Sequence, residues 1–248
     1  MNRLRMSLLA ASLAFGAQAS SHAASDETVA ALRLPVSVSR NTYAPGVAAA
    51  MHSHNVARFI YVASGGKLRV QSAAGEFREV EFVTGQGAFR GPERHALVNI
   101  GKTPLDFWEI DLVHATESRF LPEDQSNLGP LPDVPDTPDR RCLFRNRWGT
   151  LTWRRVGPGD EWQPARAGHD TLLLRLSRVE IKMIGADGTE RHRTIQAGDQ
   201  AWVSAGSSSG WMNEGRAEAV MLELSLEEPA VLFRPTVITG APSGVDRR

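Results

Sequence analysis

Residues 46–65 read GVAAAMHSHNVARFIYVASG, and this stretch decides how the rest of the chain is interpreted. It places His52 and His54 one residue apart. Because residues i and i+2 share a face of a β-strand, both imidazoles are predicted to point the same way, and the intervening Ser53 the other way. Two imidazoles on one strand face supply two of the three protein ligands that a catalytic metal usually takes. His95, in the later stretch GPERHALVN, supplies the third if its strand lies alongside.

The first residues have the pattern of a secretory signal peptide. Two arginines are followed by an apolar, Ala- and Leu-rich run over residues 6–17, and residues 17–19 (Ala-Gln-Ala) form a small-x-small cleavage site. Residues 21–23 offer a second cleavage site. The apolar run is too short to cross a bilayer, and no other run approaches the ~20 residues required. We expect a leader over residues 1–19, a periplasmic or secreted protein, and no stable membrane insertion; an uncleaved anchor is the alternative.

The charge balance argues against nucleic acid as a partner. The chain has 28 basic and 28 acidic residues, and removal of the leader takes away Arg3 and Arg5, leaving 26 against 28. A net charge near −2 disfavours nucleic acid and anionic membranes. The single Cys142 excludes an internal disulfide. Cys142 follows two arginines, and two interpretations are possible. The arginines lower the pKa of its thiol, or Cys142 is a small hydrophobic residue at the start of a strand.

Short β-type segments, separated by Gly, Pro and Asn, fill both halves of the chain at spacings typical of a sandwich or barrel. In the first half they are residues 32–38, 58–63, 67–71, 77–83, 95–100 and 105–113. In the second half they are residues 150–156, 171–178, 180–184, 191–195, 200–203 and 218–226. The turn Gly-Ala-Asp-Gly at 185–188 is predicted to join two of these strands as a hairpin.

A proline-rich segment divides the chain into two parts. Five prolines crowd residues 121–139, and because proline fixes φ and removes a donor, the segment is predicted to be an extended linker. The predicted organisation is a signal peptide (1–19), a first barrel with the metal site (26–118), the linker (119–140) and a second barrel (141–240). Each barrel then has about a hundred residues, a common domain size.

The spacing within residues 46–65 resembles the first motif of the cupin superfamily. Five residues separate Gly46 from His52-x-His54, three more precede Arg58, and six more precede Gly65. The second motif is visible as Gly85, Pro92, His95 and Asn99. The family pattern has Glu at the place of Arg58. The resemblance implies a small antiparallel jelly-roll barrel, of the RmlC-like type, with the metal ligands pointing inward from its walls.

The second half keeps the frame of these motifs and loses the ligands. The second-motif spacing recurs as Gly198, Ser204, Gly206, Ser209 and Asn213, with Ser209 in the place of histidine. When Gly159 is aligned with the first motif, the ligand places fall on Ala165, Ala167 and Thr171. The chain therefore resembles a bicupin whose C-terminal barrel carries no metal. The expected fold is all-β, with two tandem cupin barrels after a signal peptide.

The three histidines suit one divalent transition metal, with Fe as the first choice and Mn, Ni, Cu or Zn as alternatives. This set resembles the three-histidine cupin dioxygenases, which use iron and dioxygen to cleave a C–C bond or oxidise a thiol. We expect an exported metal-binding protein, and an oxygenase-like enzyme acting on a small anionic molecule. The alternatives are a non-catalytic module that binds or senses a small molecule or metal, and an oxalate-decarboxylase-like enzyme. A homodimer through barrel edges is also expected, since exposed edge strands need cover.

Arg58 is the departure from the family pattern that matters most. A guanidinium is permanently charged and cannot ligate a metal, and at ~6 Å from a divalent ion its repulsion is roughly 5 kcal/mol at an effective dielectric of ~20. Three interpretations are open. Arg58 orients the charge of an anionic substrate, as a catalytic residue; it marks a site that has lost its metal; or it pairs structurally with Glu93, Glu109 or Asp111. Tyr61 is expected on the opposite strand face.

Overall fold

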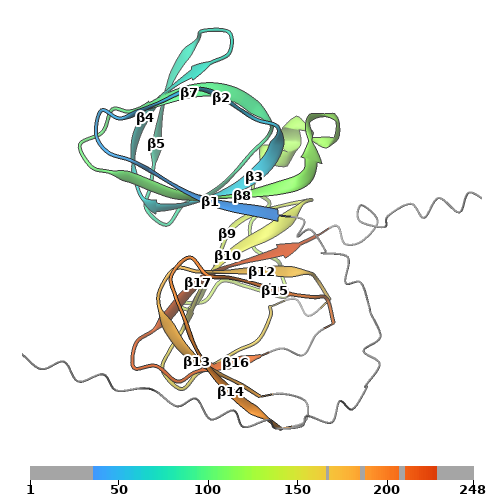
Figure 1. Cartoon of the computed structure of the whole chain (residues 1–248). Coiled ribbons are helices and arrows are strands. Elements are labelled where there is room, and N and C mark those ends of the chain that lie inside the picture. The colour runs from blue at the N-terminus through green and yellow to red at the C-terminus, as the bar shows by residue number, and fades with distance from the viewer. Residues whose placement is uncertain (1–35, 166–167, 185–187, 207–209, 228–248) are drawn as a thin grey trace, which may run out of the picture. The chain divides into compact units, whose positions relative to one another are not determined.

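The computed structural model describes residues 36–227, except for 166–167, 185–187 and 207–209 (Figure 1). The expected leader therefore lies outside the described residues. Within them, the regular structure consists of β-strands and two short 3-10 helices, η1 (Glu117–Arg119) and η2 (Pro122–Gln125). The all-β prediction is confirmed. In the described part of the chain, no helix has both the length and the hydropathy needed to cross a membrane.

The first barrel is formed by two four-stranded antiparallel sheets (Figure 1). One sheet has the order β1 (Val36–Tyr43), β8 (Leu105–Thr116), β3 (Val56–Ser64) and β6 (Gly87–Arg90). The other has the order β2 (Ala48–His54), β7 (Glu93–Asn99), β4 (Gly66–Ser72) and β5 (Phe77–Phe82). Successive strands of the chain often fall in different sheets, as expected for a jelly roll.

The second barrel repeats this arrangement. One sheet has the order β15 (Gln200–Val203), β12 (Thr171–Arg175), β17 (Ala219–Leu226), β10 (Gly149–Val156) and β9 (Arg140–Asn146). The other has the order β11 (Glu161–Trp162), β16 (Trp211–Asn213), β13 (Val179–Ile184) and β14 (Glu190–Ile195). Strands β13 and β14 pair from Ile184–Glu190 outward, as the predicted hairpin requires, although residues 185–187 lie outside the described part.

A buried asparagine closes each barrel in the same way. The Asn99 side chain donates to the carbonyls of Tyr43 (2.8 Å) and Thr103 (2.9 Å), and its Oδ1 accepts from the Gly101 amide (2.9 Å). Asn213 makes the matching bonds to Val156, Ala217 and Gly215, each at 2.9 Å. Both side chains are fully buried, so losing either would leave buried backbone groups unpaired. The repeat predicted from the sequence is therefore present.

Matching glycines shape the turns of the two barrels. Gly46 (φ +78°) and Gly159 (φ +79°) occupy the left-handed region, where a side chain is strained. Each donates its amide to the carbonyl of the closing asparagine, at 2.8 and 2.7 Å. Gly85 (φ +82°) and Gly198 (φ +92°) form a second matching pair. The glycines of the motifs therefore form equivalent turns in both halves.

The apolar side chains of β3 separate into two groups by strand alternation. Ile60 and Val62 belong to a core cluster inside the first barrel, with Phe107 of β8 opposite them. Phe59 and Tyr61 belong instead to another cluster, which also contains residues of β10, β12 and β17. Tyr61 therefore lies on the face away from the barrel interior, as expected. The interior of the second barrel is filled by a third cluster that includes Trp162, Trp211 and Met221.

The segment between the barrels is more structured than the expected extended linker. Helix η2 begins at a proline, and Asp124 within it is almost completely buried. Its carboxylate accepts hydrogen bonds from Arg147 Nε (2.6 Å), Trp148 Nε1 (2.9 Å) and the Leu121 amide (2.9 Å). These bonds attach the segment to the start of the second barrel. Proline spacing alone could not predict this, because the anchoring acid and its partners are distant in sequence.

Several strands escaped the sequence pattern. Strand β6 has four residues, and β11 and β16 have two and three, which is too short for an alternation to be recognised.

Strand β9 contains Cys142, which is free. Burial, and then the nearby Asp136 charge, raise the pKa of the Cys142 thiol. The lowered-pKa interpretation of Cys142 is therefore wrong, and the small hydrophobic residue in a strand is the better description.

Candidate metal centre

Strands β2 and β7 bring the three histidines together. They pair antiparallel, with His52 opposite His95 and His54 opposite Glu93. A β-bulge interrupts the register between Ala49 and His52, so that β2 holds one extra residue there. Ala49 packs against the core inside the first barrel, and the bulge shifts the alternation so that His52 and His54 also face inward.

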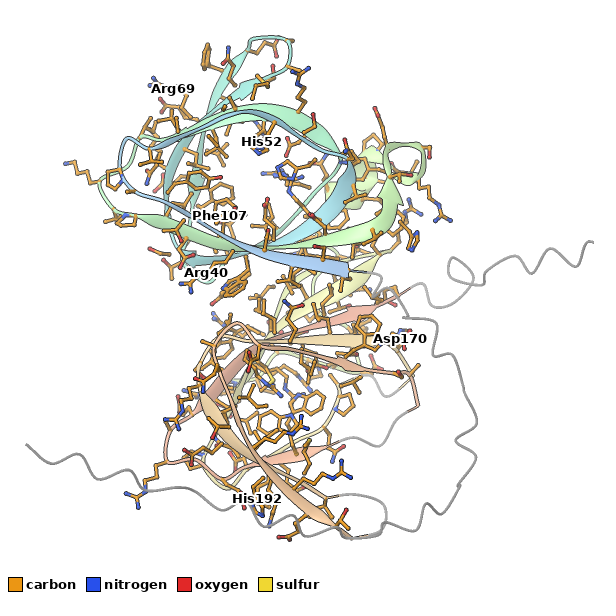
Figure 2. The ribbon with its side chains drawn as sticks, in the orientation of Figure 1. Arg40, His52, Arg69, Phe107, Asp170 and His192 are labelled. Atoms are coloured by element: carbon orange, nitrogen blue, oxygen red, sulfur yellow. The ribbon has the colours of Figure 1, made fainter. Side chains whose placement is uncertain are left out.

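The imidazoles converge inside the first barrel. Their candidate ligand atoms lie within 4.8 Å of one another. Among the described residues, these three histidines form a group of side chains that could hold a metal ion. His52 Nε2 is 3.1 Å from His54 Nε2, and the ring centroid of His95 lies 4.7 Å from that of His52. Figure 2 shows His52 and Phe107 inside this barrel, whereas Arg69 projects outward. The structure therefore brings together the three residues that the sequence singled out.

Local contacts prepare these rings to act as ligands. His52 Nδ1 lies 2.8 Å from the Ala50 carbonyl. Since a carbonyl can only accept, Nδ1 carries the proton and Nε2 keeps its lone pair, directed at His54. Burial, then the positive charge of Arg58 and the neighbouring imidazoles, lower the pKa of His54 to about 4. His54 is therefore neutral at physiological pH, as a metal ligand must be.

Glu93 lies directly behind the third histidine. His95 Nδ1 is 3.4 Å from Glu93 Oε1, and this buried nitrogen has no well-aligned hydrogen-bond partner among the described residues. Burial alone would raise the pKa of Glu93, but His95 and Arg58 outweigh it and lower the pKa to about 2. A carboxylate beside the outer nitrogen of a ligating histidine fixes which nitrogen faces the metal. Glu93 is placed to do this for His95.

Arg58 is held by two carboxylates. Its Nε donates to Glu109 Oε1 and its Nη2 to Glu93 Oε1, both at 2.8 Å, while Nη1 donates to the Gly91 carbonyl at 3.2 Å. The side chain is only 2% exposed. Asp111, the third partner considered from the sequence, forms no ion pair with Arg58 in the described structure. These contacts favour the structural interpretation of Arg58, and its role toward substrate stays a prediction.

The pairing of Arg58 removes the main objection to a metal at this place. One guanidinium and two carboxylates carry a net charge of −1, so the trio of Arg58, Glu93 and Glu109 does not repel a cation as an isolated arginine would. Glu109 also accepts from Asn41 Nδ2 at 2.8 Å, which holds its second oxygen. The ligand type of the three histidines therefore fits a divalent ion, and the paired Arg58 does not by itself oppose one.

A cavity of about 50 Å³ lies next to this centre. One end is lined by the charged side chains of Arg58, Arg78, Arg90, Glu93 and Glu109, together with His95. The rest of its lining is hydrocarbon from strands of both sheets. Arg78 and Arg90 were missed by the sequence reasoning. The i, i+2 rule could have found Glu93 as a companion of His95, but nothing in the pattern marked the short strand that carries Arg90.

The second barrel has other groups at the matching places. Ala165 donates its amide to the buried Glu223 (2.8 Å), and the Thr171 hydroxyl lies 3.2 Å from that of Ser225. Ala167 and Ser209 lie outside the described residues. An alanine cannot ligate a metal, so the described positions give no ligand set comparable to that of the first barrel.

The chain matches no known family profile and no curated protein sequence. Its fold is similar to that of solved structures. AerE from Microcystis aeruginosa is 14% identical with a TM-score of 0.58, over 78% of this chain and 88% of AerE. Oxalate decarboxylase from Bacillus subtilis at pH 4.6 is 16% identical with a TM-score of 0.50, over 77% of this chain and 68% of the enzyme. At such identity the likeness establishes the fold alone.

Proposed function

Starting from the two-barrel cupin fold of this chain, we propose that it is an exported metal-binding protein with an oxygenase-like activity on a small anionic organic molecule. The first barrel holds one divalent transition metal through His52, His54 and His95. The observation that carries the proposal is the convergence of these three imidazoles within 4.8 Å, beside a cavity with a charged end. Three protein ligands leave positions open for water, dioxygen or substrate.

The three imidazoles would suit a divalent transition metal such as Fe, Mn, Ni, Cu or Zn. The resemblance to the three-histidine cupin dioxygenases makes Fe the first choice, with Mn, Ni, Cu and Zn as alternatives.

The protein's own residues would bind and orient. The bound metal would supply a Lewis acid, or a redox centre for dioxygen, next to the cavity. Glu93 keeps the His95 ring in place, and Arg58 keeps Glu93 and Glu109 in place through its two ion pairs. The hydrocarbon wall beyond them excludes water from the inner part of the cavity.

Elemental analysis of the purified full chain tests the metal. The expected result is close to one equivalent of a divalent transition metal per chain, and its loss in His52→Ala. His192→Ala is the matched control, because His192 is exposed and pairs with Glu214 in the second barrel. If the native protein and its reconstituted form both lack metal under conditions where the control folds, the proposal is wrong.

Oxygen uptake separates an enzyme from a binding module. The metal-loaded protein would be tested with small carboxylates, phenols and thiols, and uptake that disappears in His52→Ala is expected. A metal-loaded protein that turns over no member of the panel would favour the second candidate, a non-catalytic module that binds or senses a small molecule or metal. Oxalate-decarboxylase-like bicupins use a glutamate ligand, and this chain has Arg58 at that place. The binding module is therefore a better second candidate than an oxalate-decarboxylase-like activity.

Export rests on the first residues of the sequence. Cell fractionation and N-terminal sequencing of the mature protein test it. Cleavage after Ala19 leaves Ser20 as the first residue, and cleavage after Ala23 leaves Ala24. A mature protein in the cytoplasm that begins at residue 1 would contradict export. The homodimer through barrel edges is part of the same proposal, and sedimentation of the mature protein tests it.

A further inference from the structure

The cavity of the first barrel has two chemically different ends. Six polar side chains line one end. All the other lining residues have hydrocarbon side chains, among them Ile60, Val62, Leu68, Val70, Leu97 and Phe107. Most of these belong to the barrel's own core cluster and are buried. Its volume of about 50 Å³ is far below the ~150 Å³ of a cavity that accepts benzene. The apolar end therefore suits a short aliphatic chain and not an aromatic ring.

Arg90 is the arginine at the charged end that forms no ion pair with a carboxylate of the described residues. It lies opposite Arg58 across β3 and β6, so the two side chains share the inward face. Within the described residues, Arg90 makes one side-chain hydrogen bond, a 3.4 Å contact with Gln125 Oε1, and no ion pair. Burial, and then the positive charge of Arg78, hold the pKa of Arg90 below its usual value, and the negative charge of Glu93 offsets them only in part. A half-buried guanidinium beside other cations is costly unless an anion joins it.

Arg78 gives the charged end its access to solvent. Its side chain is 54% exposed, and its Nη2 lies 3.6 Å from Glu93 Oε2, beyond a normal hydrogen bond. Arg58, by contrast, already donates to two carboxylates. The lining therefore carries three arginines against two glutamates, and the unmatched positive charge lies with Arg78 and Arg90. A carboxylate can take two parallel hydrogen bonds from one guanidinium.

We propose that the ligand of this barrel is a short aliphatic carboxylate, whose anionic group is held by Arg90 and Arg78 and whose hydrocarbon chain fills the apolar end of the cavity. The inference deepens the function proposed above, because it names the substrate class of the same site. It also assigns the recognition of substrate charge to Arg90 in place of Arg58. His95, one of the three metal ligands, lines the charged end, so the carboxylate would lie on the side of the cavity nearest the metal.

Calorimetric titration of the full chain tests the inference with and without metal. The probe is 3-methylbutanoate, compared with 3-methylbutanamide, which has the same shape without the charge, and with benzoate, which is too large for the apolar end. We expect 3-methylbutanoate to bind at least tenfold more tightly than either. Arg90→Met should weaken its binding at least tenfold. Arg69→Met is the matched control, because Arg69 pairs with Glu79 on the outer side of β4.

The discrimination among the three probes needs no variant, so it decides the case even where Arg90→Met folds poorly. Equal affinity for the acid and its amide, or tighter binding of benzoate, would overturn the inference. So would unchanged binding in a folded Arg90→Met protein. Binding of 3-methylbutanoate to a chain that takes up no metal would keep this inference and reject the metal-dependent function. A metal-loaded chain that prefers no carboxylate would do the reverse.

Discussion

Glu93 joins the two unusual features of the metal centre. One of its oxygens accepts from Arg58 Nη2 at 2.8 Å and lies 3.4 Å from His95 Nδ1. The guanidinium that stands at the place of the family's glutamate is thus bound to another glutamate, two residues before the third histidine. This carboxylate belongs to β7, in the other sheet of the barrel, where it can act on the metal through His95 and not as a ligand itself.

Replacing Glu93 by Gln should weaken metal binding about 10- to 100-fold. The amide keeps the size of the side chain but removes the negative charge beside His95, and it leaves Arg58 with one carboxylate instead of two. Competition with a chelator of known affinity measures the change. Glu79→Gln is the control, because Glu79 forms an exposed pair with Lys67 and Arg69. Equal metal affinity in the two variants would show that Glu93 does not support the ligand.

Replacing Arg58 by Met should destabilise the fold by about 3–5 kcal/mol, because it leaves Glu93 and Glu109 without their cation in a buried place. Urea unfolding at pH 7 measures this. Arg69→Met, an exposed arginine in a surface pair, should change stability by no more than about 1 kcal/mol. A stable Arg58→Met protein that binds metal more tightly than wild type would mean that repulsion, and not structure, is the main effect of Arg58.

At the scale of the element, the bulge in β2 explains why the sequence predicted the ligands but not their surroundings. The i, i+2 rule needs only the local strand, so it placed His52 and His54 on one face correctly. Carrying the alternation back to Ala49 would give the wrong face, because the bulge inserts one residue between them. Contacts across strands depend on such registers, and for that reason the partner of Arg58 could not be chosen among three acids.

Short strands set the other limit on what the sequence predicts. Strand β6 has four residues, yet it brings Arg90 opposite Arg58 and into the cavity. Four residues hold too few alternations to separate a strand from a turn. The motif residues were easier to predict. Gly46 forms a turn and Asn99 binds backbone groups, and matching residues recur in the second half. The sequence therefore predicted the frame and the ligands, but not the charged end of the cavity.

Asp124 gives the segment between the barrels its pH dependence. Burial alone would raise the pKa of Asp124, but the hydrogen bonds from Arg147, Trp148 and Leu121 outweigh it and lower the pKa. A carboxyl whose pKa is lower in the folded state stabilises the fold above its unfolded value of about 4, and that stabilisation is lost as the pH falls further. Asp124→Asn should therefore cost about 1–3 kcal/mol at pH 7 and less at pH 3.

Urea unfolding of Asp124→Asn and wild type at both pH values checks this prediction. Asp133→Asn, an exposed position in the same segment, should leave stability unchanged at both. A difference between Asp124→Asn and wild type that stays the same from pH 7 to pH 3 would mean that the carboxylate's charge contributes nothing. The hydrogen bonds could then be replaced by those of an amide.

At the scale of the whole molecule, the described residues, which begin at Val36, all belong to one compact unit. One core cluster draws residues from both halves, among them Phe59 and Phe89 of the first barrel and Leu222 and Leu224 of the second. Gly87 of β6 lies so close to Leu143 of β9 that a Cβ on the glycine would stand 2.5 Å from the leucine Cβ. Apolar packing of this kind makes the stability of each half depend on the other.

Metal bound in the first barrel should consequently stabilise the second. Five of the six tryptophans lie in the second half, so tryptophan fluorescence during urea unfolding reports mainly on that half. Metal at 100 times its dissociation constant should add about 2.7 kcal/mol to the free energy of unfolding. Because the halves share a core, we expect the fluorescence transition and the circular-dichroism transition to move together by this amount. His52→Ala, which loses a ligand, should show no shift at the same metal concentration.

A fluorescence transition that stays in place while part of the circular-dichroism signal moves would mean that the two barrels unfold independently. The shared cluster would then not couple them.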